Sequence, residues 1–268
     1  MKIFIPGLIM AVLLSGCNNQ DAPADASKSD NSQLYAMQAT SYKWPTAQPG
    51  IKVASNILAT NYYLVIDGSG SMEESGCSEG ILKIEVAKAA VTQFVNKIPA
   101  DANVGLFTFD INNVSEKVPL GLDRETVLQN VAAIEVGGGT PLRSAIRGAY
   151  HALTQQALTQ LGYGEYHLVV VTDGEASSGE DPLSVVNEIL SNSPIVLHTI
   201  GFCIDPGHSL NIPGKTDYRS ANNPAELLQG LASVLAESTE YVIDEFKQGA
   251  AAPATTVPAT TVPGKAAP

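Results

Sequence analysis

The chain has 268 residues, of which 15 are basic and 27 acidic, giving a formal net charge of −12. No cluster of lysine or arginine stands out along it, so the composition argues against the basic surface that binds nucleic acid, and no nucleic-acid partner is predicted. The acidity suits an exported, cation-binding protein, but it is equally ordinary for a soluble surface.

The N-terminus has the pattern of a secretory signal. One lysine precedes the apolar segment Ile3–Leu14, which is too short for a bilayer core that needs about twenty apolar residues. The end of this segment, Leu14-Ser15-Gly16-Cys17, resembles a bacterial lipobox, in which the signal is cut before a cysteine that is then acylated. The resemblance implies a signal peptide over residues 1–16 and a lipid anchor on Cys17. We therefore expect the protein in the bacterial cell envelope, held at a membrane by this anchor. By analogy with enterobacterial lipoproteins, Asn18 favours the outer membrane.

Polar and proline-containing segments flank the centre of the chain. Residues 17–57 are rich in Asp, Ser, Asn, Gln, Ala and Pro and are predicted to form a flexible linker. Residues 239–268 form an Ala/Thr/Pro-rich tail in which Ala-Thr-Thr-Val-Pro occurs twice. Neither segment can bury enough apolar area to order itself. The folded domain is expected over residues 58–238, which is long enough for one sizeable core.

The first buried strand of this domain, Tyr62–Ile66, runs into the motif Asp67-Gly68-Ser69-Gly70-Ser71. One carboxylate and two hydroxyl groups offer only oxygen ligands, which suit Mg²⁺ or Ca²⁺ rather than zinc or copper. We expect the two glycines to take positive φ and so fold the backbone tightly enough for the three side chains to converge. A simple Gly/Ser turn after a strand explains the motif equally well when it is considered alone.

Apolar runs alternate with amphipathic segments along the rest of the domain. Strands are expected over residues 62–66, 104–109, 117–122, 167–172, 195–201 and 216–219, and helices over 81–97, 123–134, 141–161, 183–190 and 224–237. Strands joined by helices predict an α/β fold with a doubly wound, mostly parallel sheet flanked by helices. Ligands of such sheets bind beyond the carboxyl ends of the strands, where the strand order reverses. The strand ends carrying Asp67 and Asp173 are the best candidates to flank that point.

A glycine-rich loop leads into the long helix of the second half. Thr140 followed by Pro141 is typical of an N-cap and a first helical residue. Taken alone, Thr140 is explained by this capping role, and Asp173-Gly174 by a turn after a strand. The interpretation as a site depends on all three segments meeting at one edge of the sheet.

The three segments together resemble the von Willebrand factor A domain, in which they form the metal-ion-dependent adhesion site. The resemblance covers roughly residues 58–238 and includes scaffold positions in the first helix, the second strand and the Thr140-Pro141-Leu142 turn. It implies the Rossmann-like fold of that family. It also implies that Ser69 and Ser71 bind one divalent cation, Mg²⁺ or Ca²⁺, directly.

By the same resemblance, Asp67 and Asp173 act partly through bound water, and Thr140 binds directly or through water. The family's remaining coordination position is often filled by a carboxylate of the partner. A divalent ion held by few protein charges stays electrophilic, so an acidic residue of a protein ligand gains a strong contact. The neighbouring acidic side chains Glu73, Glu74 and Glu175 are interpreted as solvated loop charges rather than ligands.

With Cys17 assigned to the anchor, Cys77 and Cys203 remain, an even number in an exported protein, and a disulfide is expected. Cys77 lies in a long loop after the serine motif, and Cys203 follows a strand that ends at the same edge, so the bridge would join two rim loops. The four histidines have no spacing that joins them into a metal site and are interpreted as structural or surface residues.

Two other functions compete with adhesion. A metal-dependent phosphohydrolase of the haloacid dehalogenase type also has an aspartate at the end of its first strand, but its second aspartate, the general acid, is Ser69 in this chain. No serine-hydrolase elbow or Walker motif occurs, so no enzyme is predicted. A structural envelope protein with a purely stabilising ion is the other alternative.

Overall fold

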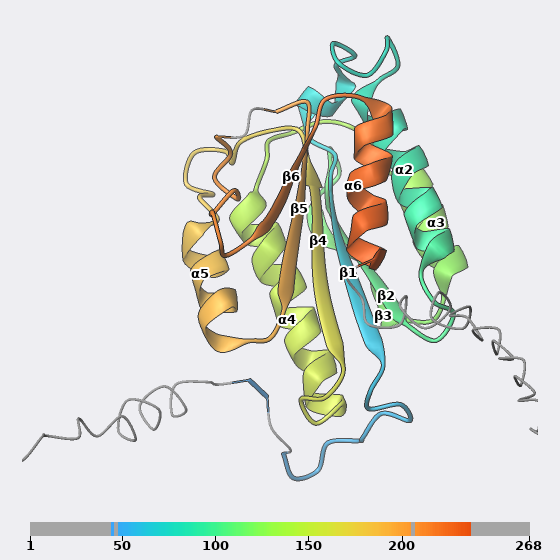
Figure 1. Ribbon diagram of the computed structural model, residues 1–268, viewed down its shortest axis with the longest axis vertical. Helices are drawn as coiled ribbons and strands as arrows, with labels where there is room; N and C mark the ends of the chain where they lie inside the picture. Colours follow the sequence, from blue (N-terminus) through green and yellow to red (C-terminus); the bar gives the residue numbers. More distant parts are fainter. Residues whose placement is uncertain (1–43, 46–47, 205–206, 237–268) are drawn as a thin grey trace, which may run out of the picture. The chain divides into compact units, whose positions relative to one another are not determined.

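The computed structural model describes residues 44–45, 48–204 and 207–236, which contain a six-stranded sheet covered by helices on both faces (Figure 1). The strands are β1 (Thr60–Asp67), β2 (Asn103–Phe109), β3 (Val114–Gly121), β4 (Glu165–Thr172), β5 (Val196–Phe202) and β6 (Asp217–Ala221). The helices are the 3-10 turn η1 (Gly70–Glu73), α2 (Lys83–Lys97), α3 (Arg124–Ala132), α4 (Leu142–Thr159), α5 (Leu183–Asn192) and α6 (Pro224–Ala236).

The strand order is β3-β2-β1-β4-β5-β6, and only β3 is antiparallel to its neighbour. The chain builds outward from β1 in one direction through β2 and β3, then returns to the other side of β1 to add β4, β5 and β6. The order therefore reverses between β1 and β4. Both strands end at the edge where ligands bind in open parallel sheets. The predicted doubly wound α/β fold is confirmed.

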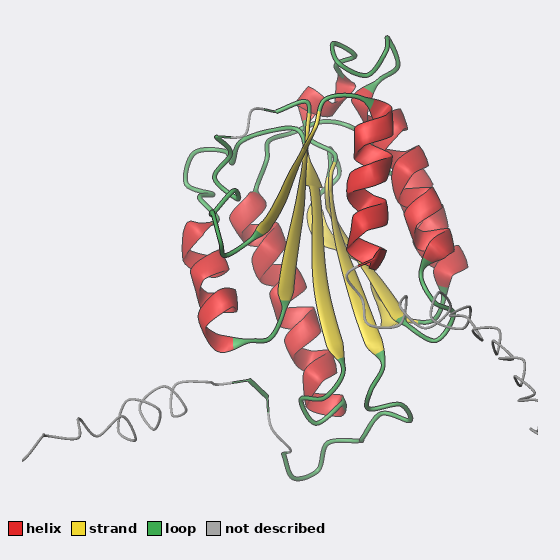
Figure 2. Cartoon of the chain, in the orientation of Figure 1, coloured by secondary structure: helices red, strands yellow, loops and turns green. Residues whose placement is uncertain are grey.

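Alternate side chains of the central strand enter two different cores. Tyr62, Leu64 and Ile66 lie in the core beneath α2, α3 and α6, whereas Tyr63 and Val65 lie in the core beneath α4 and α5. Figure 2 shows these two helical layers on either side of the sheet. All eight residues of β1 are buried, as expected of a parallel strand that is covered on both faces.

The predicted elements are all present, with shifted ends. Helix α2 begins at Lys83 rather than residue 81, β3 begins at Val114 rather than residue 117, and η1 was not predicted. Asp123 caps α3 by accepting a hydrogen bond from the Thr126 amide at 3.0 Å.

The predicted capping role of Thr140 is wrong, because Pro141 itself occupies the N-cap position of α4 and Thr140 lies one residue earlier. At the last helix the predicted capping pattern is correct: the Glu226 amide donates to Asn223 Oδ1 at 2.9 Å.

The predicted signal peptide, Cys17 and the predicted C-terminal tail lie outside the described residues. No described helix combines the length and the apolar character needed to cross a membrane. Contacts with the domain already occur at Trp44, whose indole nitrogen donates to the Gly162 carbonyl oxygen at 3.2 Å and whose ring packs edge-on against Tyr166.

Candidate functional site

The candidate site lies where β1 and β4 end side by side. Asp67 is the last residue of β1, and Asp173 follows the last residue of β4. The Asp67 side chain is fully buried, and so are the neighbouring Thr172 and most of Ser69. The parallel pairing of β1 with β4 brings together carboxylates that are more than a hundred residues apart in the sequence. The predicted convergence of these two strand ends is therefore present in the fold.

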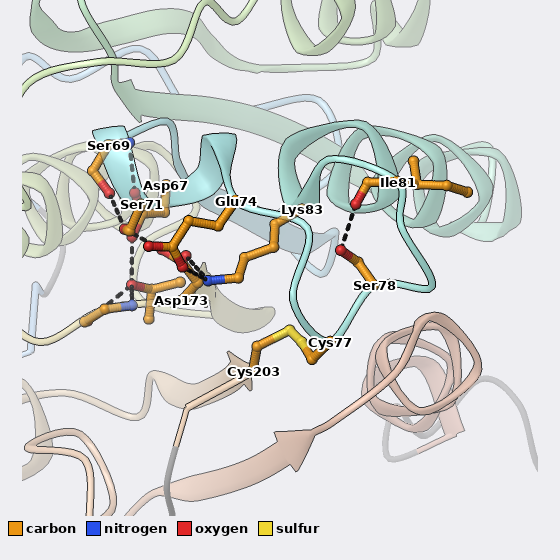
Figure 3. Close-up of polar contacts among 12 residues, drawn as sticks. Asp67, Ser69, Ser71, Glu74, Cys77, Ser78, Ile81, Lys83, Asp173 and Cys203 are labelled. Carbon is orange, nitrogen blue, oxygen red and sulfur yellow. Dashed lines mark hydrogen bonds and ion pairs between the residues drawn. A yellow bond between two sulfur atoms is a disulfide. The ribbon is translucent and has the colours of Figure 1, made fainter.

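A continuous chain of hydrogen bonds joins four of the predicted ligands (Figure 3). The Ser69 amide donates to Asp67 Oδ1 at 2.7 Å, and the Ser69 and Ser71 hydroxyl oxygens are 3.1 Å apart. Ser71 Oγ then donates to Asp173 Oδ1 at 2.7 Å. The second oxygen of Asp67 accepts a hydrogen bond from Thr172 Oγ1 at 2.6 Å. The two carboxylates and the two serine hydroxyls thus form one cluster.

The glycines of the motif act differently from the prediction. Neither Gly68 nor Gly70 has a positive φ, so the expected left-handed backbone is absent at both positions. Gly68 is instead fixed by close packing: a Cβ there would lie 2.8 Å from Ile134 Cγ2 and 2.9 Å from the Phe109 carbonyl oxygen. At Gly70 the nearest atom, the Gly138 carbonyl oxygen, would be at an ordinary 3.6 Å. Only Gly68 is required for steric reasons.

Thr140 reaches the same cluster from the glycine-rich loop. A Cβ placed on Gly174 would lie 3.6 Å from both Ser71 Oγ and Thr140 Oγ1, so the two hydroxyl groups flank Gly174. The Thr140 backbone is held by Ser177, whose hydroxyl accepts from the Thr140 amide at 2.8 Å and whose amide donates to the Thr140 carbonyl oxygen at 3.0 Å. All five predicted site residues therefore gather at one edge of the sheet.

Lys83 is a further residue of the site that sequence reasoning missed. Its ammonium nitrogen lies 2.9 Å from Asp173 Oδ2 and 2.8 Å from Glu74 Oε2 (Figure 3). Glu74, predicted to be a solvated charge, is exposed but is the second partner of this lysine. A signal was available, because Lys83 is one turn before Ala87 on the helix face that carries Ala90 and Phe94 into the core.

The electrostatics of the cluster centre on Asp67. Burial raises its pKa to about 6, the Asp173 charge adds to this effect, and the hydrogen bonds from Ser69 and Thr172 oppose it. Hydrogen bonds, rather than a neighbouring positive charge, hold this buried carboxylate, so a positive ion beside it would be favourable. The set of two carboxylates and three hydroxyls is the oxygen chemistry that hard cations prefer. Within the described part of the chain, no three His, Cys, Asp or Glu side chains are grouped around one point, so a cation here relies on the hydroxyl groups.

The rim of the site is tied together by the predicted disulfide between Cys77 and Cys203. Cys77 lies in the loop between η1 and α2, and Cys203 lies directly after β5. The Cys203 amide also donates to the Ala221 carbonyl oxygen at 2.7 Å, which fixes this end of the bridge to β6. The bridge holds the loop that begins at Glu74 and leads into α2 at Lys83 against the sheet.

The histidines contribute to structure, as predicted. His167, His198 and Asp217 form a buried hydrogen-bonded row across β4, β5 and β6. His208 supports the candidate site indirectly, because its Nε2 is 3.0 Å from the carbonyl oxygen of Gly174, the residue after Asp173.

Comparisons with known proteins agree with this fold. Residues 62–175 match the von Willebrand factor type A domain model. An uncharacterized protein of Bacillus subtilis (strain 168), YwmD, is 26% identical over 204 residues, which is 68% of this chain and 87% of that protein.

Two solved structures share the fold. The vWF domain of the type V pili tip protein Mfa5 from Porphyromonas gingivalis has a TM-score of 0.50 at 14% identity, covering 67% of this chain and 94% of that one. The pilus adhesin SpaC from Lactobacillus rhamnosus GG has a TM-score of 0.53 at 16% identity, covering 71% of this chain and 31% of that one. The chain thus contains a von Willebrand factor type A domain, with the mostly parallel, Rossmann-like sheet of that domain.

Proposed function

We propose that this protein is a membrane-anchored module that binds a protein partner through one divalent cation, Mg²⁺ or Ca²⁺. Asp67, Ser69, Ser71, Thr140 and Asp173 would hold the ion, and an acidic residue of the partner would complete its coordination. The observation that carries the proposal is the hydrogen-bonded row from Asp67 through Ser69 and Ser71 to Asp173 at the strand-order reversal.

The chemistry of these five residues supports a cation whose coordination the protein completes only in part. Two carboxylates and three hydroxyls neutralise a divalent charge only in part, because Lys83 already pairs with Asp173. A bound cation would keep a positive field that attracts a carboxylate from outside. Two solved structures with the same fold come from pilus proteins, one named as a tip protein and one as an adhesin, which is consistent with a protein-binding role. No catalytic role is proposed, because Ser69 stands where a phosphohydrolase of the haloacid dehalogenase type needs its general acid.

Cation binding is tested first on the purified exported domain. Binding of an ion to the native state alone stabilises it by about 2.7 kcal/mol when the ion is present at a hundred times its dissociation constant. We expect Mg²⁺ or Ca²⁺ to raise the melting temperature and EDTA to reverse the effect. Asp67→Ala should abolish the response. Asp123→Ala is the matched control, since Asp123 caps α3 away from the site and its removal should leave the response intact.

Partner binding is tested by capture from an envelope extract with and without EDTA. We expect captured protein to be lost on chelation and in Asp67→Ala, and retained in Asp123→Ala. Capture that continues unchanged after both treatments would contradict the adhesion mechanism and favour an ion with a purely stabilising role. A phosphatase activity that disappears in Asp67→Asn would favour the enzyme instead.

The proposed anchor has its own test. We propose that Cys17 carries the acyl chains that hold the protein in the cell envelope, with the outer membrane favoured. More than one chain is needed for stable anchoring, so replacement of the single acylated residue should release the protein completely. Fractionation of cells that express Cys17→Ser should move the protein out of the membrane fraction. Unchanged membrane retention would contradict the anchor but not the cation site.

A further inference from the structure

Lys83 carries a charge into the buried part of the site. Its side chain is 7% exposed, and it occupies the first position of α2 on the face that packs into the core. Lysine is almost never buried in this way unless its ammonium group is paired. An apolar side chain at the start of this helix would fill the same space without the charge, so the charge of Lys83 calls for an explanation.

The ammonium group is paired on two sides. On the inner side it lies 2.9 Å from Oδ2 of Asp173, whose side chain is completely buried. On the outer side it lies 2.8 Å from Oε2 of Glu74, whose side chain is 68% exposed. The Lys83 amide also donates to the Glu74 carbonyl oxygen at 2.8 Å, so backbone and side chain hold the two residues together.

Lys83 stays charged in this setting. Its ammonium group is within hydrogen-bond distance of two carboxylates, at 2.8 Å and 2.9 Å, and opposite charges this close favour the charged form. A permanent positive charge therefore lies against one of the two carboxylates of the candidate cation site.

Asp173 is shared between this charge and the serine motif. One carboxylate oxygen accepts from Ser71 Oγ at 2.7 Å, and the other contacts the Lys83 ammonium group. A cation held on the Ser71 side would lie within about 6 Å of the ammonium group, a distance at which like charges repel strongly in a partly buried site.

We propose that Lys83 is a built-in competitor of the divalent cation: it neutralises Asp173 in the free domain and lowers the affinity of the site for the ion. The inference rests on the proposed function, since it takes Asp173 as a ligand. The free domain then holds its cation weakly. The carboxylate of an acidic partner restores the missing negative charge, so cation binding and partner binding strengthen each other by the same factor.

The competing explanation is that Lys83 only orients Asp173 for the cation. The two roles predict opposite signs. If Lys83 competes, removal of its charge tightens cation binding, because repulsion disappears and a buried carboxylate is left to be neutralised. If Lys83 only orients Asp173, the same change weakens cation binding.

The test is calorimetric titration of Mg²⁺ and Ca²⁺ into wild-type, Lys83→Met and Lys83→Gln proteins. Lys83→Gln keeps a hydrogen-bond donor, so it carries the test if the methionine variant does not fold. We expect binding at least about tenfold tighter without the charge, as for removal of one like charge a few ångström from a divalent ion at an effective dielectric constant near 20. Lys88→Met is the matched control: Lys88 pairs with Glu85 on the same helix, 3.1 Å away, and its removal should leave the affinity unchanged.

A second readout does not depend on the cation. In EDTA, Lys83→Met should unfold at a lower temperature than Lys88→Met, because Asp173 loses its partner while buried. A third readout returns to cation binding. Glu74→Gln should weaken it, because loss of the Glu74 carboxylate makes the net charge around the Lys83 ammonium group more positive.

The outcomes separate the two proposals. Equal or weaker cation binding in both Lys83 variants would overturn the competitor role while leaving the proposed cation site standing. Absence of cation binding in the wild type and in every variant would overturn the cation site and the competitor role together. Binding that appears only after Lys83 is replaced would support both.

Discussion

Asp67 and Gly68 show how one short motif serves two physical requirements. Asp67 ends a buried strand, and its carboxylate is held by the Ser69 amide and the Thr172 hydroxyl. Gly68 lets the backbone pass directly against Phe109 and Ile134, which no side chain would permit. The position of the serine hydroxyls therefore depends on close packing beneath them as much as on their own chemistry.

Gly68→Ala should destabilise the domain and disturb the site together. The added Cβ would meet a backbone oxygen at 2.9 Å, and backbone cannot move aside as a flexible side chain can. We expect a loss of about 1–3 kcal/mol in the free energy of unfolding, the usual range for overpacking, measured by urea denaturation. The thermal response to Mg²⁺ or Ca²⁺ should fall as well.

Gly70→Ala provides the matched control for this prediction. The added Cβ has an ordinary 3.6 Å contact, and the residue is exposed, so stability should change by less than about 0.5 kcal/mol. Equal losses in the two variants would show that the backbone conformation, rather than close packing, sets the need for glycine.

At the scale of elements, the loop from η1 to α2 is held at both ends. Glu74 is bound to Lys83 at the base of the loop, and Cys77 is joined to Cys203 beyond β5. Both half-cystines also pack against the core under α2 and α6. The loop at the rim of the candidate site is thereby fixed to two different parts of the sheet.

Removal of the bridge should lower stability substantially. The half-cystines are 126 residues apart in the sequence, so the bridge closes a long loop in the unfolded chain. The chain-entropy model gives up to about 5 kcal/mol for a loop of this size. We expect the Cys77→Ala/Cys203→Ala double variant to melt at a lower temperature than the wild type in calorimetry.

The reductant response provides the control for the bridge. Reduction should lower the melting temperature of the wild type towards that of the double variant, and it should not affect the double variant. Complete reduction of the wild type would be verified by thiol labelling. If the reduced protein melts at the same temperature as the oxidised protein, packing alone holds the loop.

At the scale of the whole molecule, a row of polar side chains, His167, His198 and the half-buried Asp217, crosses the sheet away from the candidate site. His167 Nδ1 is 3.1 Å from His198 Nε2, and His198 Nδ1 is 2.9 Å from Asp217 Oδ2. His167 also stacks on Tyr62 of β1, so the row joins four strands of the sheet. Burial, followed by the neighbouring His198, lowers the pKa of His167.

This row makes the stability of the domain dependent on pH. Histidine in the unfolded chain takes up a proton near pH 6.5, whereas native His167 stays neutral to lower pH. The unfolded state therefore binds more protons below this pH, and the free energy of unfolding falls as the pH is lowered from about 6.5 towards the native pKa.

The measurement is urea denaturation at pH 7.5 and pH 5 in EDTA. The raised pKa of Asp67, about 6, has the opposite effect on stability over this range, but it acts equally in every variant, so the comparison between variants isolates His167. We expect His151→Gln to show the same change in stability as the wild type, since His151 is an exposed residue of α4. On going to the lower pH, the stability of His167→Asn should shift in the favourable direction relative to the wild type. The same pH dependence in all three proteins would assign the effect to other groups.

The amino-acid sequence by itself determined the kinds and order of the elements. Burial on both faces requires continuous apolar runs such as Leu168–Val171, and packing on a sheet requires the three-and-four spacing seen in α2. Both signals depend only on residues close together in the chain. The oxygen chemistry of the Asp67 motif and the pairing of Cys77 with Cys203 could also be predicted, because residue type carries most of that information.

Only the tertiary structure decided which residues meet. Whether Asp67 lies beside Asp173 depends on the strand order, and Asp173, the buried partner of Lys83, is 90 residues away from it. The need for glycine at position 68 arises from atoms of Phe109 and Ile134, which lie on other elements. The periodicity of apolar residues along the chain cannot predict such contacts between distant segments. Charge pairing and close packing act through space, so the sequence could indicate the residues of the proposed site and the buried helix face of Lys83, but not the carboxylate that this lysine contacts.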